Sequence, residues 1–345
     1  MKKIKQFNAA ENAFLVEDGL SPEQDVKETA SLKSILLKLL NEYTIVWIVI
    51  LTGLILFISN EHFGTVGNLT SVLRQSAFVG IGAVGMTFVI MGGGIDLSVP
   101  GIVSLTAVIG AFLMPVAGVV VGLLAALLCG IFLGLINGMV IMRLKIPPFV
   151  ATLGTGYVYL SIVFMITNEQ VVMVNSPIIL NVGMGSLLGI PIPFIILIAC
   201  TLLCSFLSKC SRYGRLVRSI GSSLNATRAA GISVNRVTIF SYMVLGLLTA
   251  LTGVILSGYL SSANGNMGTG YDLNTIAAAV VGGTSLQGGK GSFVGTLAGA
   301  LFFSMISNAL DLFGVGSYWQ YVATGSVIIF AITLDGLKAK YKSHA

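Results

Sequence analysis

Charged residues are scarce in this sequence of 345 residues. Asp, Glu, Lys and Arg together make up 9% of it, whereas soluble proteins carry about 25%. No charge occurs between Asp96 and Arg143, or between Lys145 and Glu169. This distribution excludes an ordinary soluble domain, and the hydrophobic content of 55% predicts a chain embedded in a lipid bilayer.

Residues that build reactive sites are also few, with 2 histidines and 4 cysteines. His62 and His344 lie at the end of a predicted span and in a tail, so neither supplies the midplane group on which ion-coupled carriers depend. The cysteines lie in or beside apolar runs without metal or disulfide spacing. No nucleophile–base set or carboxylate pair can be assembled. The sequence therefore predicts no catalytic residues, no metal site and no enzymatic activity.

Ten apolar segments are candidates for membrane-spanning helices, each of which needs about 20 residues to cross the hydrocarbon. They are Thr44–Ser59, Val72–Gly92, Ser98–Met114, Val116–Met142, Phe149–Thr167, Pro191–Ser208, Val237–Gly258, Tyr271–Thr284, Ser292–Asp311 and Tyr318–Leu334. Two polar stretches beside them, Asn175–Asn181 and Asn264–Gly268, are predicted as exposed loops. We therefore predict an all-α polytopic membrane protein with about ten transmembrane helices.

Lysine and arginine are distributed unevenly between the two sides of these spans. With both termini in the cytoplasm, Arg74 alone among the basic residues falls on the outer side, as expected because basic loops are retained inside. We predict a cytoplasmic tail of residues 1–43, a membrane domain of residues 44–336 with a cytoplasmic loop at 209–236, and a cytoplasmic tail of residues 337–345. The net charge of +6 follows from this bias, so no nucleic-acid partner is predicted.

Two glycine-rich motifs resemble nucleotide-binding sequences but lack the required context. Gly80, Gly82 and Gly85 have dinucleotide-motif spacing, yet they lie inside an apolar span, where small residues favour close helix packing. The run Gly282–Gly291 looks like a phosphate-binding loop, but the spacing around Lys290 does not fit a Walker A motif. We predict that this chain binds no ATP itself.

Other glycines recur at four-residue spacing, which places each set on one helix face. This arrangement predicts close packing of helices within the chain, with dimerisation as the alternative. The sets are Gly118 and Gly122; Gly130, Gly134 and Gly138; and Gly295 and Gly299.

Polar residues within the apolar segments are candidates for a solute path, because burying them is costly without a function. Asp96 stands between three glycines and Pro100, where it either caps the next helix or lines the mouth of a path. Asn274 begins a later span and has the same two interpretations. The absence of paired intramembrane charges favours a neutral, polyhydroxylated solute. The predicted path residues are Asp96, Ser98, Asn137 and Asn274.

The loop Lys209–Arg236 is basic, rich in small residues and interrupted by three glycines. This pattern predicts a short helix around Leu224–Ala230 that presents Arg228 to a partner protein. The alternative is a positive loop that only maintains topology.

These motifs resemble the membrane subunits of ribose-type ABC importers, from about Asn60 to Gly336. The matching stretches are Gly93–Ser98, Gly214–Arg215, Ala226–Ile232, Gly270–Leu273, Gly282–Leu286 and Gly288–Gly291. Pro100 departs from the family, which generally has glycine there, and Ser223 and Leu224 replace an asparagine and an acidic residue.

The resemblance implies a type II ABC importer permease in the inner (plasma) membrane of a bacterium. It implies a second permease copy or paralogue, ABC ATPase subunits that bind the ATP, a periplasmic or extracellular sugar-binding protein, and contact with membrane lipid. It also places ATPase coupling in one loop, at Gly214, Arg215, Gly221, Ala226, Arg228 and Gly231.

We therefore expect a permease subunit that translocates a neutral monosaccharide, a pentose or a hexose, with energy from separate ATPase subunits. The alternative is a passive channel or an ion-coupled secondary carrier for a small polar solute.

Overall fold

The computed structural model describes residues 44–316 together with Trp319, Val322, Gly325, Ser326, Ile329 and Thr333. The chain divides into a unit of residues 1–44 and a unit of residues 45–345, and the fold below is that of the second unit. The predicted tails at 1–43 and 337–345, and most of the predicted span Tyr318–Leu334, lie outside the described residues.

Seven helices of the described part are long and apolar enough to cross a membrane. They are α4 (Val66–Met91), α5 (Val99–Ala117), α6 (Val119–Leu144), α7 (Pro148–Thr167), α9 (Ile192–Cys210), α12 (Val234–Leu260) and α14 (Phe293–Leu312). Two other predicted spans form shorter helices, α3 (Thr44–Ser59) and α13 (Tyr271–Val281). A mostly helical fold with several spans is therefore confirmed, while the number ten and the side of the termini stay predictions.

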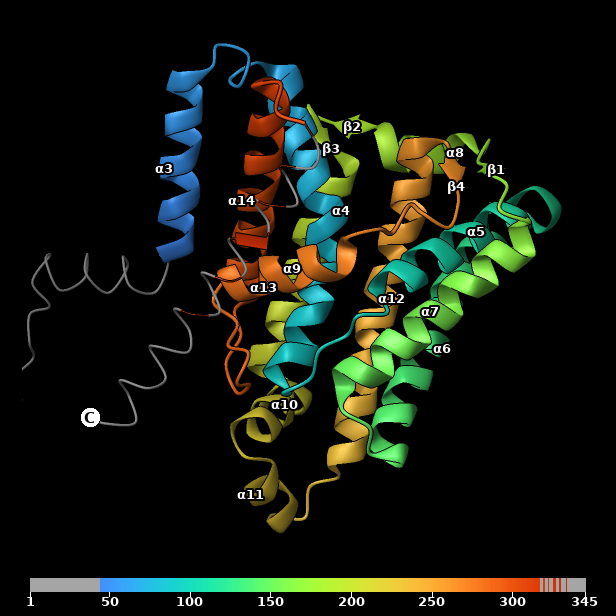
Figure 1. The fold of residues 1–345 in the computed structure, drawn as a ribbon, viewed down its shortest axis with the longest axis vertical. Coiled ribbons are helices and arrows are strands. Elements are labelled where there is room, and N and C mark those ends of the chain that lie inside the picture. The colour runs from blue at the N-terminus through green and yellow to red at the C-terminus, as the bar shows by residue number, and fades with distance from the viewer. Residues whose placement is uncertain are drawn as a thin grey trace, which may run out of the picture. The chain divides into compact units, whose positions relative to one another are not determined.

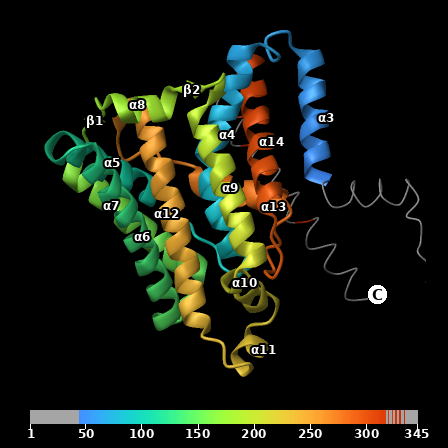
Figure 2. The same ribbon diagram turned by 180° about the vertical axis from the view of Figure 1, so that it is seen from behind.

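The remaining elements are short and lie at the ends of the long helices. They are β1 (Val172–Met173), α8 (Pro177–Met184), β2 (Ser186–Leu187), β3 (Ile190–Pro191), α10 (Arg212–Ser222), α11 (Leu224–Ala229) and β4 (Ser262–Ala263). The strands form two antiparallel pairs, β1 with β4 and β2 with β3. Figures 1 and 2 show α10 and α11 at the end of α9 and α12 that is opposite to α8.

Helix α12 lies between two groups of helices, with α5, α6 and α7 on one side and α4, α9 and α14 on the other (Figures 1 and 2). Glycines allow the closest approach, since Cβ atoms on Gly130 and Gly134 of α6 would overlap backbone atoms of Gly246 and Tyr242 in α12. Close packing within the chain is thus confirmed for this glycine set.

The glycines with dinucleotide-motif spacing also serve helix packing. A Cβ on Gly80 would lie 2.8 Å from the Leu197 side chain, and one on Gly85 would lie 2.9 Å from the Cα of Leu245. The prediction for Gly118 was wrong, because this residue has a φ of 90° and no atom within 4 Å of an added Cβ. It forms the turn between α5 and α6 instead of packing beside Gly122.

Two of the non-helical segments in the described residues lie beside α5, residues 92–98 between α4 and α5 and residues 264–270 between β4 and α13. The prediction of an exposed loop was wrong for Gly265, Met267 and Gly268 of the second segment, which are buried, whereas Asn266 is exposed as predicted. Gly268 fits there because its missing side chain leaves room for the backbone of Pro100. The polar groups of a buried irregular backbone need partners from the protein or from a polar cavity, which makes both segments candidates for function.

The other predicted loop, Asn175–Asn181, also proved more ordered than its composition indicated. It contains the start of α8, whose Ile179 is buried. Gly183 of α8 packs on the backbone of Gly258 and Tyr259 in α12. A short amphipathic helix therefore covers this end of α12.

Candidate solute path and coupling surface

Asp96 lies at the centre of a buried network of hydrogen bonds. Its side chain is 0% exposed, as are those of Ser98 and Asn137. The Asp96 Oδ1 atom accepts hydrogen bonds from the backbone N–H of Ser98 at 2.7 Å and from Ser98 Oγ at 2.6 Å. The Asn137 side-chain amide donates to Asp96 Oδ2 at 3.1 Å. Three of the four predicted path residues are thus in direct contact.

The amide oxygen of Asn137 extends this network to α7. It accepts hydrogen bonds from Thr155 Oγ1 at 2.7 Å and from the Tyr159 hydroxyl at 2.8 Å. Sequence reasoning missed both partners, together with Thr152, which accepts a hydrogen bond from the backbone N–H of Leu97. The spacing of Thr152, Thr155 and Tyr159 places them on one helix face, and this signal could have identified them.

The main chain around Asp96 is fixed by a further helix, α12. The Tyr242 hydroxyl donates to the carbonyl oxygen of Ile95 at 3.1 Å. Segment 92–98 is consequently held by α6, α7 and α12 together. Of the two sequence interpretations of Asp96, the N-cap position of α5 belongs to Ser98, while Asp96 binds the Ser98 N–H as an Asx turn does.

The network consists of a carboxylate, an amide and several hydroxyl groups. Within the described residues, no lysine or arginine forms an ion pair with Asp96, so its carboxylate is satisfied by three neutral donors. In this conformation the polar groups bind one another. The same carboxylate, amide and hydroxyl groups match the donors and acceptors of a neutral polyol. Within the same part of the chain, no cluster of three His, Cys, Asp or Glu residues could hold a metal ion.

Asn274 does not join this network. It lies half-buried in the first turn of α13, next to the second non-helical segment. The structure therefore separates the predicted path residues into a group of three and one isolated member.

The predicted partner-binding loop forms two helices, α10 and α11. The predicted helix at Leu224–Ala230 is observed as α11, Leu224–Ala229, capped by the Ser223 hydroxyl. Helix α10 was missed, although Val217 and Ile220 form an apolar stripe with arginines on the other face. Burial raises the pKa of the Tyr213 hydroxyl, which is hydrogen-bonded to Ser241 of α12 at 2.8 Å. These contacts attach α10 firmly to the bundle.

The six predicted coupling residues fall into two groups. Gly214 and Gly221 lie in contact with the bundle, where Gly214 packs on the backbone of Ser208 at the turn from α9. The other four are exposed on α10, α11 and the turn after it, and they are Arg215, Ala226, Arg228 and Gly231. Because it contains Arg215 and Arg228, this exposed group gives α10 and α11 a basic surface.

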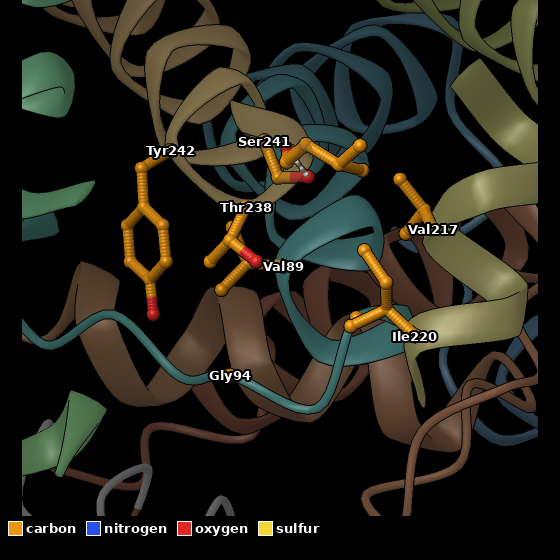
Figure 3. Close-up of a pocket in the computed structure, with 9 residues that line it drawn as sticks. Val89, Gly94, Val217, Ile220, Thr238, Ser241 and Tyr242 are labelled. Atoms are coloured by element: carbon orange, nitrogen blue, oxygen red, sulfur yellow. Dashed lines mark hydrogen bonds between the residues drawn. The ribbon is translucent and has the colours of Figure 1, made fainter. Parts of the chain in front are cut away.

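A small cavity lies between this surface and the Asp96 network. Its walls include Val217 and Ile220 of α10, Gly94 of the non-helical segment, and Tyr242 of α12. Figure 3 shows Tyr242 extending toward the segment that contains Gly94, with Val217 and Ile220 on the opposite side. Its volume of about 10 Å³ holds about one water molecule. The cavity is therefore too small to be a site for a sugar-sized solute.

Comparison with known proteins identifies the family. Residues 68–332 match the family described as the permease component of the branched-chain amino acid transport system. This chain belongs to that permease family. The resemblance to ribose-type importer permeases is confirmed, and the permease is a multi-pass membrane protein.

Several curated relatives cover most of the permease. The ribose import permease protein RbsC of Haemophilus influenzae is 37% identical over 86% of this chain and 93% of its own length. RbsC of Bacillus subtilis is 41% identical over 83% of this chain and 90% of its own length. The D-allose transport system permease protein AlsC of Escherichia coli is 33% identical over 82% of this chain and 87% of its own length. No solved structure gives a significant match to the permease.

Proposed function

We propose that this permease is the membrane subunit of an ATP-driven importer for a neutral monosaccharide, a pentose or a hexose, in the bacterial inner membrane. Relatives named for ribose and D-allose support this cargo class. The permease contributes the conduit and no ATPase site. Separate ABC ATPase subunits, an external sugar-binding protein and a second permease copy or paralogue complete the assembly.

The observation that carries this proposal is the basic surface of α10 and α11. Residues 209–236 contain six lysines and arginines and no acidic residue. Both helices begin with a serine cap, since Ser211 accepts from the Gly214 N–H and Ser223 from the Ala226 N–H. Caps of this kind define where each helix begins. A basic, ordered surface supports docking to an ATPase subunit with acidic residues in its groove.

The solute path is proposed to include Asp96, Ser98 and Asn137. Irregular backbone at the ends of membrane helices is a common place for substrate sites in transporters, because the backbone and its polar neighbours can exchange partners with a solute. Here the buried Asp96 carboxylate lies in such a segment, residues 92–98 between α4 and α5. Asn274 is proposed to contact solute from the first turn of α13. In the described conformation the first three residues bind one another, which supports a closed state that opens when α10 moves.

Reconstitution tests this proposal. The permease would be inserted into liposomes with its ATPase subunits and binding protein, and uptake of radiolabelled ribose and D-allose would be measured with and without internal ATP. Accumulation that requires ATP, the ATPase and the binding protein is expected. Uptake by the permease alone, or driven by an ion gradient, would instead favour a passive channel or a secondary carrier.

A replacement on the exposed surface would then locate the coupling. Arg228→Ala is expected to abolish ATP-driven uptake while the protein still inserts in the membrane, because the side chain is exposed and supports no part of the bundle. Unchanged uptake in Arg228→Ala would contradict docking at α11.

A further inference from the structure

The glycine-rich segment Gly282–Gly291, whose spacing does not fit a Walker A motif, lies against α10 and the end of α4. The backbone N–H of Gly289 donates to the carbonyl oxygen of Met91 at 2.8 Å. A Cβ on Gly288 would lie 2.8 Å from the carbonyl oxygen of Gly221 in α10. A Cβ on Gly221 would overlap both the Met91 oxygen and the Gly289 nitrogen. Three backbones therefore meet here without a side chain between them.

This junction lies at the end of α4, where the non-helical segment 92–98 begins. Met91 is the last residue of α4, and the carbonyl groups of a final helical turn lack partners within their own helix. Gly289 supplies the partner for Met91. The next residues in the chain lead to Asp96 and its buried network. A displacement of the junction would therefore act on the network through only a few residues.

The same glycine-rich segment is tightly joined to α13 and α14. Its first residue, Gly282, packs on the backbone of Gly295, and Gly299 packs on the carbonyl of Ala278. The N–H of Thr284 donates to the Ala279 carbonyl oxygen at 3.0 Å. These backbone contacts leave little freedom between the segment and the two helices, because no flexible side chain separates them.

Glycine is required at the junction for two separate reasons. Gly288 and Gly289 have φ values of 83° and 77°, which side-chain-bearing residues adopt at a cost. Gly221 has ordinary helical geometry in α10, so its requirement is steric alone. Substitutions at Gly221 and Gly289 therefore disturb one contact by different means.

We infer that Gly221, Gly288 and Gly289 are positioning residues that transmit displacement of α10 to α13 and α14. In this scheme α10, the end of α4 and segment 282–291 move together during the ATP cycle. One movement at the coupling surface then acts on both non-helical segments, through α4 on residues 92–98 and through α13 on residues 264–270. The inference rests on the proposed function, because it assumes that an ATPase displaces α10.

Hydrogen exchange of the assembled complex tests this transmission without reference to the cargo. The complex of permease and ATPase subunits would be compared without nucleotide and after trapping with ATP and vanadate. We expect amide protection in residues 212–222 and 282–291 to change together on trapping. If α10 and α11 show no change, the proposed docking surface is wrong. If α10 changes while 282–291 and α13 do not, only the transmission through the glycine-rich segment is wrong.

A steric variant sharpens this comparison. In Gly221→Ala the added methyl group separates α10 from Met91 and Gly289, so the response of α10 to trapping should persist while that of 282–291 is lost. Gly154→Ala is the matched control, because Gly154 is also helical but has no atom within 4 Å of an added Cβ. A response of 282–291 in Gly221→Ala equal to that of the wild type would overturn the inference.

Transport stoichiometry gives a second, independent measurement. In proteoliposomes containing the whole complex, Gly289→Ala should lower ribose uptake per ATP hydrolysed by about 5-fold or more, the range of typical coupling energies. Gly189→Ala should stay near wild type, because Gly189 has a similar φ of 82° but open space around an added Cβ. Backbone strain is common to both variants, so a difference in their uptake per ATP hydrolysed measures the effect of the contacts at the junction. An equal ratio of uptake to hydrolysis in both variants would contradict the inference.

Discussion

The two non-helical segments beside α5 are held in place by different kinds of contact. Residues 92–98 depend on side chains, since Asp96 alone accepts three hydrogen bonds from Ser98 and Asn137. Residues 264–270 depend on backbone proximity, with Gly268 packed on Pro100. Ser104 of α5 adds a hydrogen bond to the Gly265 carbonyl oxygen at 3.0 Å. Both segments adjoin the first turns of α5.

This difference indicates a division of tasks between the segments. A polar network can exchange its hydrogen bonds for those of a solute or of water. Close glycine packing has no polar side chains to offer and only maintains a distance between backbones. The first segment is therefore suited to contact with cargo, and the second to keeping α5 and α13 in register. Four substitutions test this distinction, in order of decreasing expected effect.

Asp96→Ala should have the largest effect. It removes the acceptor of three buried hydrogen bonds, and each donor left unpaired costs about 1–3 kcal/mol. We expect a clear fall in the unfolding temperature of the purified permease and loss of ATP-driven uptake. Asp96→Asn is the control, because it keeps the shape and one acceptor and should lose less stability. An Asp96→Ala variant as stable as the wild type would show that the network does not hold segment 92–98.

Gly268→Ala should have the next largest effect. The added methyl group would overlap the backbone of Pro100, and overpacking of this kind costs about 1–3 kcal/mol. The unfolding temperature in detergent should fall, whereas Gly67→Ala should be neutral because nothing lies within 4 Å of its added Cβ. If Gly268→Ala unfolds at the same temperature as Gly67→Ala, backbone proximity is not what holds residues 264–270.

Ser104→Ala should produce a smaller change. The Ser104 hydroxyl donates to the Gly265 carbonyl oxygen and accepts from the Gly268 N–H at 3.3 Å. Loss of a hydrogen bond typically costs about 1 kcal/mol. We expect faster hydrogen exchange confined to residues 264–270. The control is Ser71→Ala, which loses a hydrogen bond to the Gly67 carbonyl oxygen at an exposed position of α4. Unchanged exchange in Ser104→Ala would indicate that glycine packing alone holds residues 264–270 in place.

Asn274→Ala should leave stability almost unchanged. The side chain is half-buried and outside the Asp96 network, and substitutions at such positions usually alter the free energy of unfolding by less than about 0.5 kcal/mol. If Asn274 contacts the cargo, the KM for ribose uptake should rise at an unchanged unfolding temperature. Transport kinetics identical to those of the wild type would remove Asn274 from the proposed path. The path would then be limited to Asp96, Ser98 and Asn137.

Much of the local structure could be predicted from the sequence. The helix α11 lies where glycines and small residues indicated it, because local turn and cap signals determine short exposed helices. The packing role of Gly130 and Gly134 followed from their spacing on one helix face. The contact of Asp96 with Asn137 could only be partly anticipated. Both residues were chosen as candidates, but their 41-residue separation gives no local signal that they meet.

The sequence by itself determined where the long apolar helices and the basic loop lie, since a helix that crosses a bilayer requires a long apolar run. Only the tertiary structure decided which polar groups face one another and which distant backbones the glycines meet. Asn264–Gly268 has the composition of an exposed turn, yet Gly265, Met267 and Gly268 are buried and Ser104 of α5 binds the Gly265 carbonyl oxygen. The physical reason is that composition reports solvent preference residue by residue, whereas burial of polar backbone depends on partners supplied by distant parts of the chain.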